Sequence, residues 1–169
     1  MSIDEKLAIE RIDAWIESVL DEHRGVAEQV SHRNFPRLPL YFHADTLRNA
    51  RFVVTARLPI PRLAQFDLSS RMEELPGDSE GITLVDTFFV LSGHEHDEAL
   101  FFHELVHVVQ WSVLGRARFI ASYLRGLGRY GYHASPLEAM AYSLQAMFES
   151  GCAPFSVEAH VLAALRAGS

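Results

Sequence analysis

The sequence has few of the features that mark secreted, membrane-spanning or nucleic-acid-binding proteins. Cys152 is the only cysteine, so an internal disulfide is impossible and a reducing compartment is the simpler expectation. No basic run of the kind that grips phosphate occurs, and the formal net charge is −7, so we expect no nucleic-acid partner. No stretch of about 18 uncharged apolar residues occurs, so we expect no membrane-spanning helix and no membrane partner.

The N-terminal residues also lack the pattern of an export signal. MSIDEKLAIE has no basic start followed by an apolar core, so the sequence predicts no Sec-type signal and a cytoplasmic protein. With 169 residues, of which 49% are hydrophobic and 22% charged, the composition is that of a globular protein. We therefore expect one domain over residues 1–169, with a core of its own. The oligomeric state cannot be derived from these features.

The hydrophobic pattern predicts a few strands followed by several helices. Such an order is typical of an α+β domain, and no repeat or linker divides it. Between the first helix and the first strand, NFPRLPLYF indicates an irregular crossing, and EELPGDSEG indicates a charged turn. The predicted strands are 51–58 and 82–91, and the predicted helices are 4–23, 97–114, 116–127 (broken by Gly126, Gly128 and Gly131), 135–149 and 156–167.

The segment FFHELVHVVQ, residues 101–110, places polar side chains inside an otherwise apolar helix. His103 and His107 are four residues apart and lie on one helix face, one turn from each other, with Glu104 beside that face. Two imidazoles at this spacing can reach one Zn²⁺, and the glutamate can take a proton from a water molecule that the metal activates. A cation would also compensate a carboxylate that is costly to bury.

Two other interpretations of this segment stay open. A purely structural helix could carry the same residues, although core helices rarely hold an unpaired glutamate. Two histidines and a carboxylate can also hold non-haem iron. A glutamate directly after the first histidine favours hydrolysis over oxygen chemistry.

A catalytic zinc site needs a third protein ligand. Glu138, in the segment SPLEAMAY, is the best candidate, because it lies in the first turn of its own helix. The same segment also fits a capping box, with Ser135 at the N-cap, Pro136 at the first helical position and Glu138 at the third. Glu149 and Glu158 are rivals for the third ligand, and spacing alone does not decide between these alternatives.

The remaining polar candidates have weaker signals. Gln110 is three residues beyond His107 and could bond to a ligand histidine. Tyr142, Tyr132 and His133 could stabilise an oxyanion, although each could equally be a packing or surface residue. The histidines and acids of GHEHDEA, residues 93–99, could form a second metal site, but an exposed loop with Asp97 as the helix cap explains them more simply.

HELVHVVQ, followed some thirty residues later by PLEAMAY, resembles the gluzincin clan of zinc metallopeptidases. The two segments, and GITLVDTFFVL before them, are most similar to small, largely uncharacterised bacterial zincin-like proteins. The resemblance covers about residues 81–145. It implies a zincin-like fold, His103 and His107 as zinc ligands, Glu104 as general base and Glu138 as third ligand.

We therefore expect a zinc-dependent metallopeptidase with a peptide or protein substrate. A small sheet would pack on the H-E-x-x-H helix, and later helices would close the site around Glu104 and Tyr142 as catalytic residues. The alternative is a catalytically silent zincin-like module that binds metal for structure or serves as a scaffold, because little chain remains to build a substrate cleft. The sequence does not identify the substrate.

Overall fold

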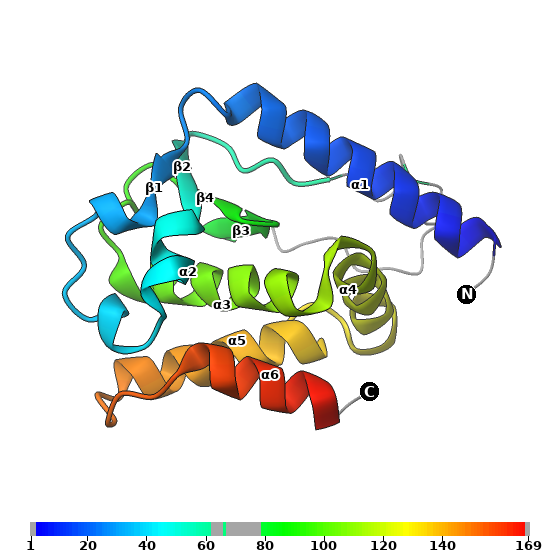
Figure 1. Ribbon diagram of the computed structural model, residues 1–169. Coiled ribbons are helices and arrows are strands. Elements are labelled where there is room, and N and C mark those ends of the chain that lie inside the picture. Colours follow the sequence, from blue (N-terminus) through cyan, green and yellow to red (C-terminus); the bar gives the residue numbers. More distant parts are fainter. Residues whose placement is uncertain (1–2, 62–65, 67–78, 168–169) are drawn as a thin grey trace.

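The computed structural model describes residues 3–61, 66 and 79–167, and it is a mixed α+β fold with a small four-stranded sheet and six α-helices (Figure 1). Most of the predicted charged turn, residues 73–78, lies outside the described residues. The strands are β1 (Glu28–Gln29), β2 (Arg51–Thr55), β3 (Gly81–Leu84) and β4 (Thr87–Leu91). The helices are α1 (Ile3–His23), α2 (Ala44–Asn49), α3 (Glu98–Leu114), α4 (Arg116–Tyr130), α5 (Pro136–Glu149) and α6 (Val157–Ala167), with 3-10 turns at Val30–His32 and Leu38–Leu40.

The strands lie in the order β1-β2-β4-β3, with β2 and β4 parallel and the outer pairs antiparallel. The prediction of a single strand over 82–91 is wrong, because the segment is the hairpin of β3 and β4. The turn falls at Val85 and Asp86, and Val85 takes a positive φ of 62°. Valine rarely takes this conformation, and the turn contains neither glycine nor proline. Nothing in the sequence therefore indicated a turn at this point. The strand predicted at 51–58 is confirmed but ends earlier, at Thr55.

The helix predictions agree with the structure except for α2 and α4. The short α2 was not predicted, because it lies in a stretch without a clear helical period. The predicted break of α4 at Gly126 and Gly128 is wrong, since the helix continues to Tyr130 and ends where Gly131 has a φ of 74°. Gly126 is buried, and a Cβ there would lie 3.0 Å from the Ser135 Cβ, so this glycine lets α4 approach the start of α5.

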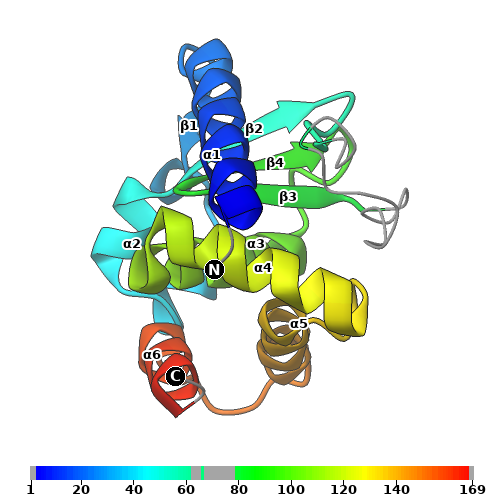
Figure 2. The same cartoon turned by 90° about the vertical axis from the view of Figure 1, so that its right-hand side faces the viewer.

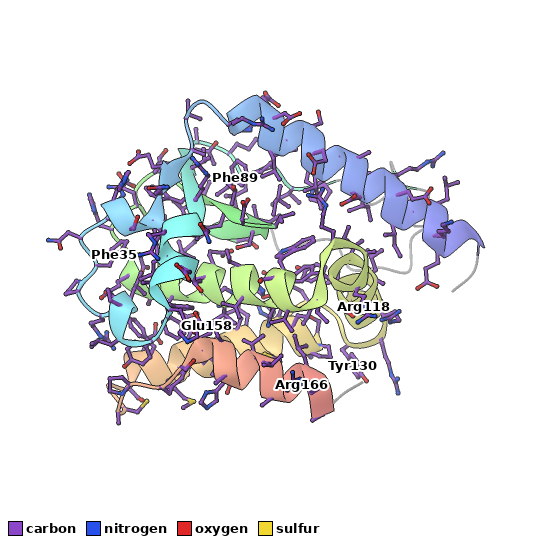
Figure 3. All side chains as sticks on the ribbon, in the orientation of Figure 1. Phe35, Phe89, Arg118, Tyr130, Glu158 and Arg166 are labelled. Carbon is purple, nitrogen blue, oxygen red and sulfur yellow. The ribbon has the colours of Figure 1, made fainter. Side chains whose placement is uncertain are left out.

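The helices cover both faces of the sheet (Figures 1 and 2). α1 lies over one face and α3 over the other, with α5 and α6 beyond α3, while α4 crosses the end of α3 between α1 and α5. Successive residues of β4 divide between two cores: Phe88 and Val90 join the core around α3. Phe89, which is labelled in Figure 3, joins the core under α1. α3 therefore lies at the centre of the molecule, between the sheet and the C-terminal helices.

Within the described residues, none of the helices combines the length and apolar character needed to cross a membrane.

Candidate metal centre

The centre is built on α3, whose residues 101–111 are all buried. Asp97 is the N-cap of this helix, and its Oδ1 accepts bonds of 3.0 Å from the backbone N–H groups of Ala99 and Leu100. The cap predicted from the sequence is therefore confirmed. With its start fixed and every side covered, α3 holds its polar side chains in the protein interior, where each needs a partner.

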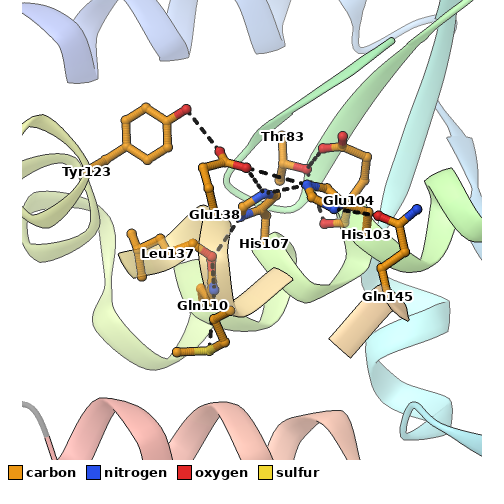
Figure 4. A network of polar contacts seen from close by, with 10 residues as sticks. Thr83, His103, Glu104, His107, Gln110, Tyr123, Leu137, Glu138 and Gln145 are labelled. Carbon is orange, nitrogen blue, oxygen red and sulfur yellow. Dashed lines mark hydrogen bonds and ion pairs between the residues drawn. The ribbon is translucent and has the colours of Figure 1, made fainter. Parts of the chain in front are cut away.

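His103, His107 and Glu138 meet at one point between α3 and the first turn of α5 (Figure 4). The two Nε2 atoms are 3.2 Å apart. Glu138 Oε2 lies 3.5 Å from His103 Nε2 and 3.4 Å from His107 Nε2. All three residues are buried, and this group could hold a metal ion.

The outer nitrogens of both imidazoles bond to glutamine amides. His107 Nδ1 lies 2.8 Å from Gln110 Oε1, and His103 Nδ1 lies 2.9 Å from Gln145 Oε1. The amides are oriented by further bonds, because Gln110 Nε2 donates to Leu137 O and Gln145 Nε2 donates to Glu149 Oε1. Since an amide oxygen only accepts, each Nδ1 donates a proton to its glutamine, and the Nε2 atom of each ring faces Glu138.

Glu138 is aimed at the histidines by a hydroxyl group. Tyr123 donates from its hydroxyl to Glu138 Oε1 at 3.1 Å, whereas Oε2 is buried and has no hydrogen-bond partner among the described residues. Burial, followed by the carboxylate of Glu138, raises the pKa of Tyr123 well above its usual value, so this hydroxyl stays a donor. Ser135 is the N-cap of α5 and Pro136 follows it, as predicted, but the Ser135 side chain makes no capping bond.

Lone pairs that converge at such distances require a positive charge between them. Without a metal, a proton on His107 supplies it: burial opposes the charged imidazole, but the Glu138 carboxylate outweighs burial and raises the pKa of His107 to about 9. Burial alone would raise the pKa of Glu138, but the neighbouring His107 and His103 outweigh burial and hold this pKa well below its usual value. A divalent cation would satisfy the same three atoms and release that proton.

Glu104 lies beside the three converging side chains and bonds to the edge strand. Its Oε2 accepts from Thr83 Oγ1 at 2.6 Å (Figure 4). Burial raises its pKa above the usual value, against the opposing effects of His103, His107 and the Thr83 bond. A Cβ at Gly81 would lie 2.4 Å from Glu104 Oε1, so the strand leaves room for this carboxylate only because residue 81 is glycine.

Two cavities meet at Glu104. One, of about 100 Å³, is mostly apolar and also has His107 and Glu138 in its wall. The other, of about 240 Å³, is polar and has His103 in its wall. Within the described residues, the centre thus adjoins one cavity on each side of Glu104.

The tyrosines predicted as candidates lie at the polar cavity. The ring of Tyr142, with 40% of the residue exposed, packs on His103 at a centroid distance of 4.6 Å. His133 lines the same cavity and packs against Tyr142. Tyr132 lines both cavities, and burial, followed by the carboxylate of Glu138, raises its pKa, so its hydroxyl is protonated at neutral pH. Tyr132 therefore shares both cavity walls with Glu104.

The rival third ligands lie elsewhere. Glu158 Oε1 accepts from His43 N and Thr46 Oγ1 at the start of α2 (Figure 3). Glu149 is exposed and reaches His103 only through the amide of Gln145.

The segment GHEHDEA contributes to a second, more open group. His94 and Asp97 from this segment lie with Glu80 so that one ligand atom of each is within 4.8 Å of the others. Glu80 and Asp97 are exposed, and Asp97 is already engaged as the cap of α3. Exposed acids of this kind need no metal to explain them.

Sequence reasoning missed three residues that hold the centre in place. Thr83, Tyr123 and Gln145 bond to Glu104, Glu138 and His103, respectively. Each is distant in sequence from its partner, so no local spacing could have shown the pair. Gln145 did carry a signal, because it lies seven residues after Glu138 on the same face of α5.

No protein-family model, curated protein or solved structure matches the chain. The resemblance to gluzincins therefore rests on the sequence motifs alone.

Proposed function

We propose that the protein is a zinc-dependent peptidase of zincin-like fold, with His103, His107 and Glu138 as the metal ligands. The observation that carries the proposal is the triangle of ligand atoms, whose sides are 3.2, 3.5 and 3.4 Å. A tetrahedral zinc with bonds of 2.0–2.1 Å separates its ligands by about 3.3–3.4 Å. The donor set of two imidazoles and one carboxylate also suits a catalytic zinc site.

The chain's own groups fit a hydrolytic reaction. Bound Zn²⁺ would polarise the substrate carbonyl and lower the pKa of water. Glu104 is held beside the ligands by Thr83 and makes no ligand contact itself, so it can accept a proton from water and return it to the leaving amine. Burial raises the pKa of Glu104 above its usual value, against the effects of His103 and His107, and so favours uptake of a proton.

The tyrosines at the cavities complete this assignment. Tyr132 is a protonated donor between the two cavities, and we assign it the role of stabilising the oxyanion. Tyr142 was expected to be catalytic, and its exposed ring on His103 suits a position at the rim of the same site. β3 is one of the two edge strands of the described sheet, so an extended substrate could pair with its outer edge.

The second candidate is a module that keeps a metal only for structure. Structural zinc sites are closed by four protein ligands, whereas this group offers three and adjoins two cavities. That arrangement favours the enzyme. Non-haem iron uses a similar ligand set, but a carboxylate beside the ligands, already bonded to Thr83, has its clearest use as a base in hydrolysis.

A peptide-library digest tests the proposal. Zinc-loaded protein is incubated with a random peptide library, and products are identified by mass spectrometry. We expect cleavage that EDTA abolishes and added Zn²⁺ restores. Absence of cleavage across the library, by protein that holds stoichiometric zinc, would favour the structural module instead.

The glycine beneath Glu104 gives a separate prediction. Gly81→Ala should push the Glu104 carboxylate out of place, because the new Cβ would lie 2.4 Å from Oε1. We expect at least about a tenfold loss of kcat/KM with zinc content unchanged, since general-base catalysis contributes roughly 10²–10⁴-fold. Gly25→Ala is the matched control, because nothing lies within 4 Å of a Cβ there. Equal activity of the two variants would show that Glu104 tolerates displacement.

A further inference from the structure

We propose that the cavity formed by the two 3-10 turns and α2 binds a small carboxylate with an apolar body, and that Arg33 holds the carboxylate group. The cavity has a volume of about 250 Å³. None of the described residues that line it also lines a cavity at the metal centre. All of them precede the segment that resembles known peptidases, so the inference goes beyond the proposed function and does not depend on it.

The floor of the cavity is part of the core around α3. Phe35, which is labelled in Figure 3, packs on Phe101 of α3 at a centroid distance of 4.7 Å. Phe42 packs on Phe102 in the same way, at 5.1 Å. Both Phe35 and Phe42 also line the cavity, so a ligand there would contact side chains that the core already holds in place. The remaining apolar lining residues are Val30, Leu38, Pro39, Ala44 and Leu47.

Arg33 brings to this wall a cationic group that lacks a hydrogen-bond acceptor. Its guanidinium lies over the ring of Phe52, with Cζ 4.7 Å from the centroid. The face of the guanidinium is thereby covered, but its N–H groups point outward in its plane. Nε is buried and has no hydrogen-bond partner among the described residues. A buried donor without an acceptor is costly, so a ligand that supplies one would be stabilised.

The polar groups of the wall select an anion. Ser31, Arg33 and Arg48 can all donate hydrogen bonds, and no carboxylate lines the described part of the cavity. A carboxylate has two oxygens that match the fork of a guanidinium. Since Arg48 is already paired with Asp45, the wall suits a singly charged carboxylate better than a phosphate.

The volume limits the size of the ligand. An engineered apolar cavity of about 150 Å³ in another protein takes benzene, with its six carbon atoms. In proportion, about 250 Å³ has room for about ten non-hydrogen atoms, which is the size of octanoate. Since each buried methylene contributes about fourfold to affinity, binding should strengthen from butanoate to octanoate and then level off at decanoate.

An NMR titration of the full chain tests the inference. Octanoate should shift the methyl signals of Val30, Leu38 and Leu47. It should bind at least about tenfold more tightly than 1-octanol, because a hydrogen bond to a charged group contributes roughly 10–150-fold. The affinity should be the same for zinc-loaded and EDTA-treated protein, since the cavity shares no described lining residue with the metal centre.

Two variants separate the charge from the cavity. Arg33→Gln should weaken octanoate binding at least about tenfold and leave 1-octanol binding unchanged, whereas a misfolded variant would lose both ligands. Ala44→Phe should block both ligands, because Ala44 lines the cavity at an exposed position where a larger side chain meets no core. Arg118→Gln is the matched control, since it removes an exposed arginine of α4.

Several results would overturn the inference. Equal affinity of wild type for octanoate and 1-octanol would remove the role of Arg33, and so would octanoate binding that Arg33→Gln does not change. Binding that needs zinc, or that shifts methyl signals of Ile16 and Leu124 instead, would place octanoate at the metal centre. Tighter binding of acetyl-Ala-Leu than of octanoate would assign the cavity to peptide C-termini rather than to a small carboxylate. None of these results bears on the proposed peptidase, which the library digest tests separately.

Discussion

Purified protein is expected to carry about one zinc ion per chain, and the His103→Ala variant is expected to carry almost none. Removing one imidazole leaves two ligand atoms, His107 Nε2 and Glu138 Oε2, which lie 3.4 Å apart. Two protein ligands do not make a stable zinc site in competition with water. Metal analysis by inductively coupled plasma mass spectrometry after gel filtration measures the stoichiometry directly.

The matched control for this experiment is His32→Ala, which removes an exposed histidine of another region. Circular dichroism should show that both variants keep the fold. Glu138→Gln tests the third ligand in the same assay, and we expect its zinc affinity to fall at least about tenfold. Full zinc retention by His103→Ala would mean that the ligands lie elsewhere, and unchanged affinity of Glu138→Gln would return attention to Glu149.

Glu104→Gln is expected to keep the zinc and the fold but to lose at least about 10²-fold in kcat/KM, which is the lower range for a general base. The amide has nearly the same shape as the carboxylate, and its oxygen can still accept the bond from Thr83 Oγ1. It cannot accept a proton from water at neutral pH. The measurement is the initial rate on a peptide found in the library digest, together with zinc content.

Glu22→Gln is the control for this prediction, because it removes a carboxylate of the same kind from the surface. Activity of Glu104→Gln within a few-fold of wild type would exclude the proposed mechanism. Loss of zinc in Glu104→Gln would instead identify Glu104 as a ligand or as an anchor for the ligands.

The sequence predicted those parts of the fold in which a strong period coincides with clear end signals. α3 has Asp97 before it and Gly115 after it, and both bounds were predicted closely. The hairpin of β3 and β4 was missed because its turn uses Val85 in a positive φ, which no residue preference indicates. The end of α4 was misplaced because Gly126 is tolerated inside the helix, where it allows contact with Ser135.

The candidate site also has a part that the sequence predicted and a part that depends on tertiary packing. His103, Glu104 and His107 were predicted together because helical geometry fixes their relation within one turn. The approach of Glu138 to them depends on how α5 packs on α3, which spacing in the sequence does not determine. The same holds for Tyr123, whose bond to Glu138 joins α4 and α5 through tertiary packing alone.

The glutamine amides behind His103 and His107 have a consequence for how firmly a metal would be kept. A carboxylate in that place would draw the Nδ1 proton and make the imidazole a stronger donor of charge to the metal. Gln110 and Gln145 are neutral, so Glu138 supplies the only formal negative charge among the ligands. A divalent ion would therefore retain one net positive charge for the substrate, and Glu104 would balance it across the buried cluster. The same weak donation would make the ion easier to exchange, so occupancy of the site would follow the concentration of free metal ion.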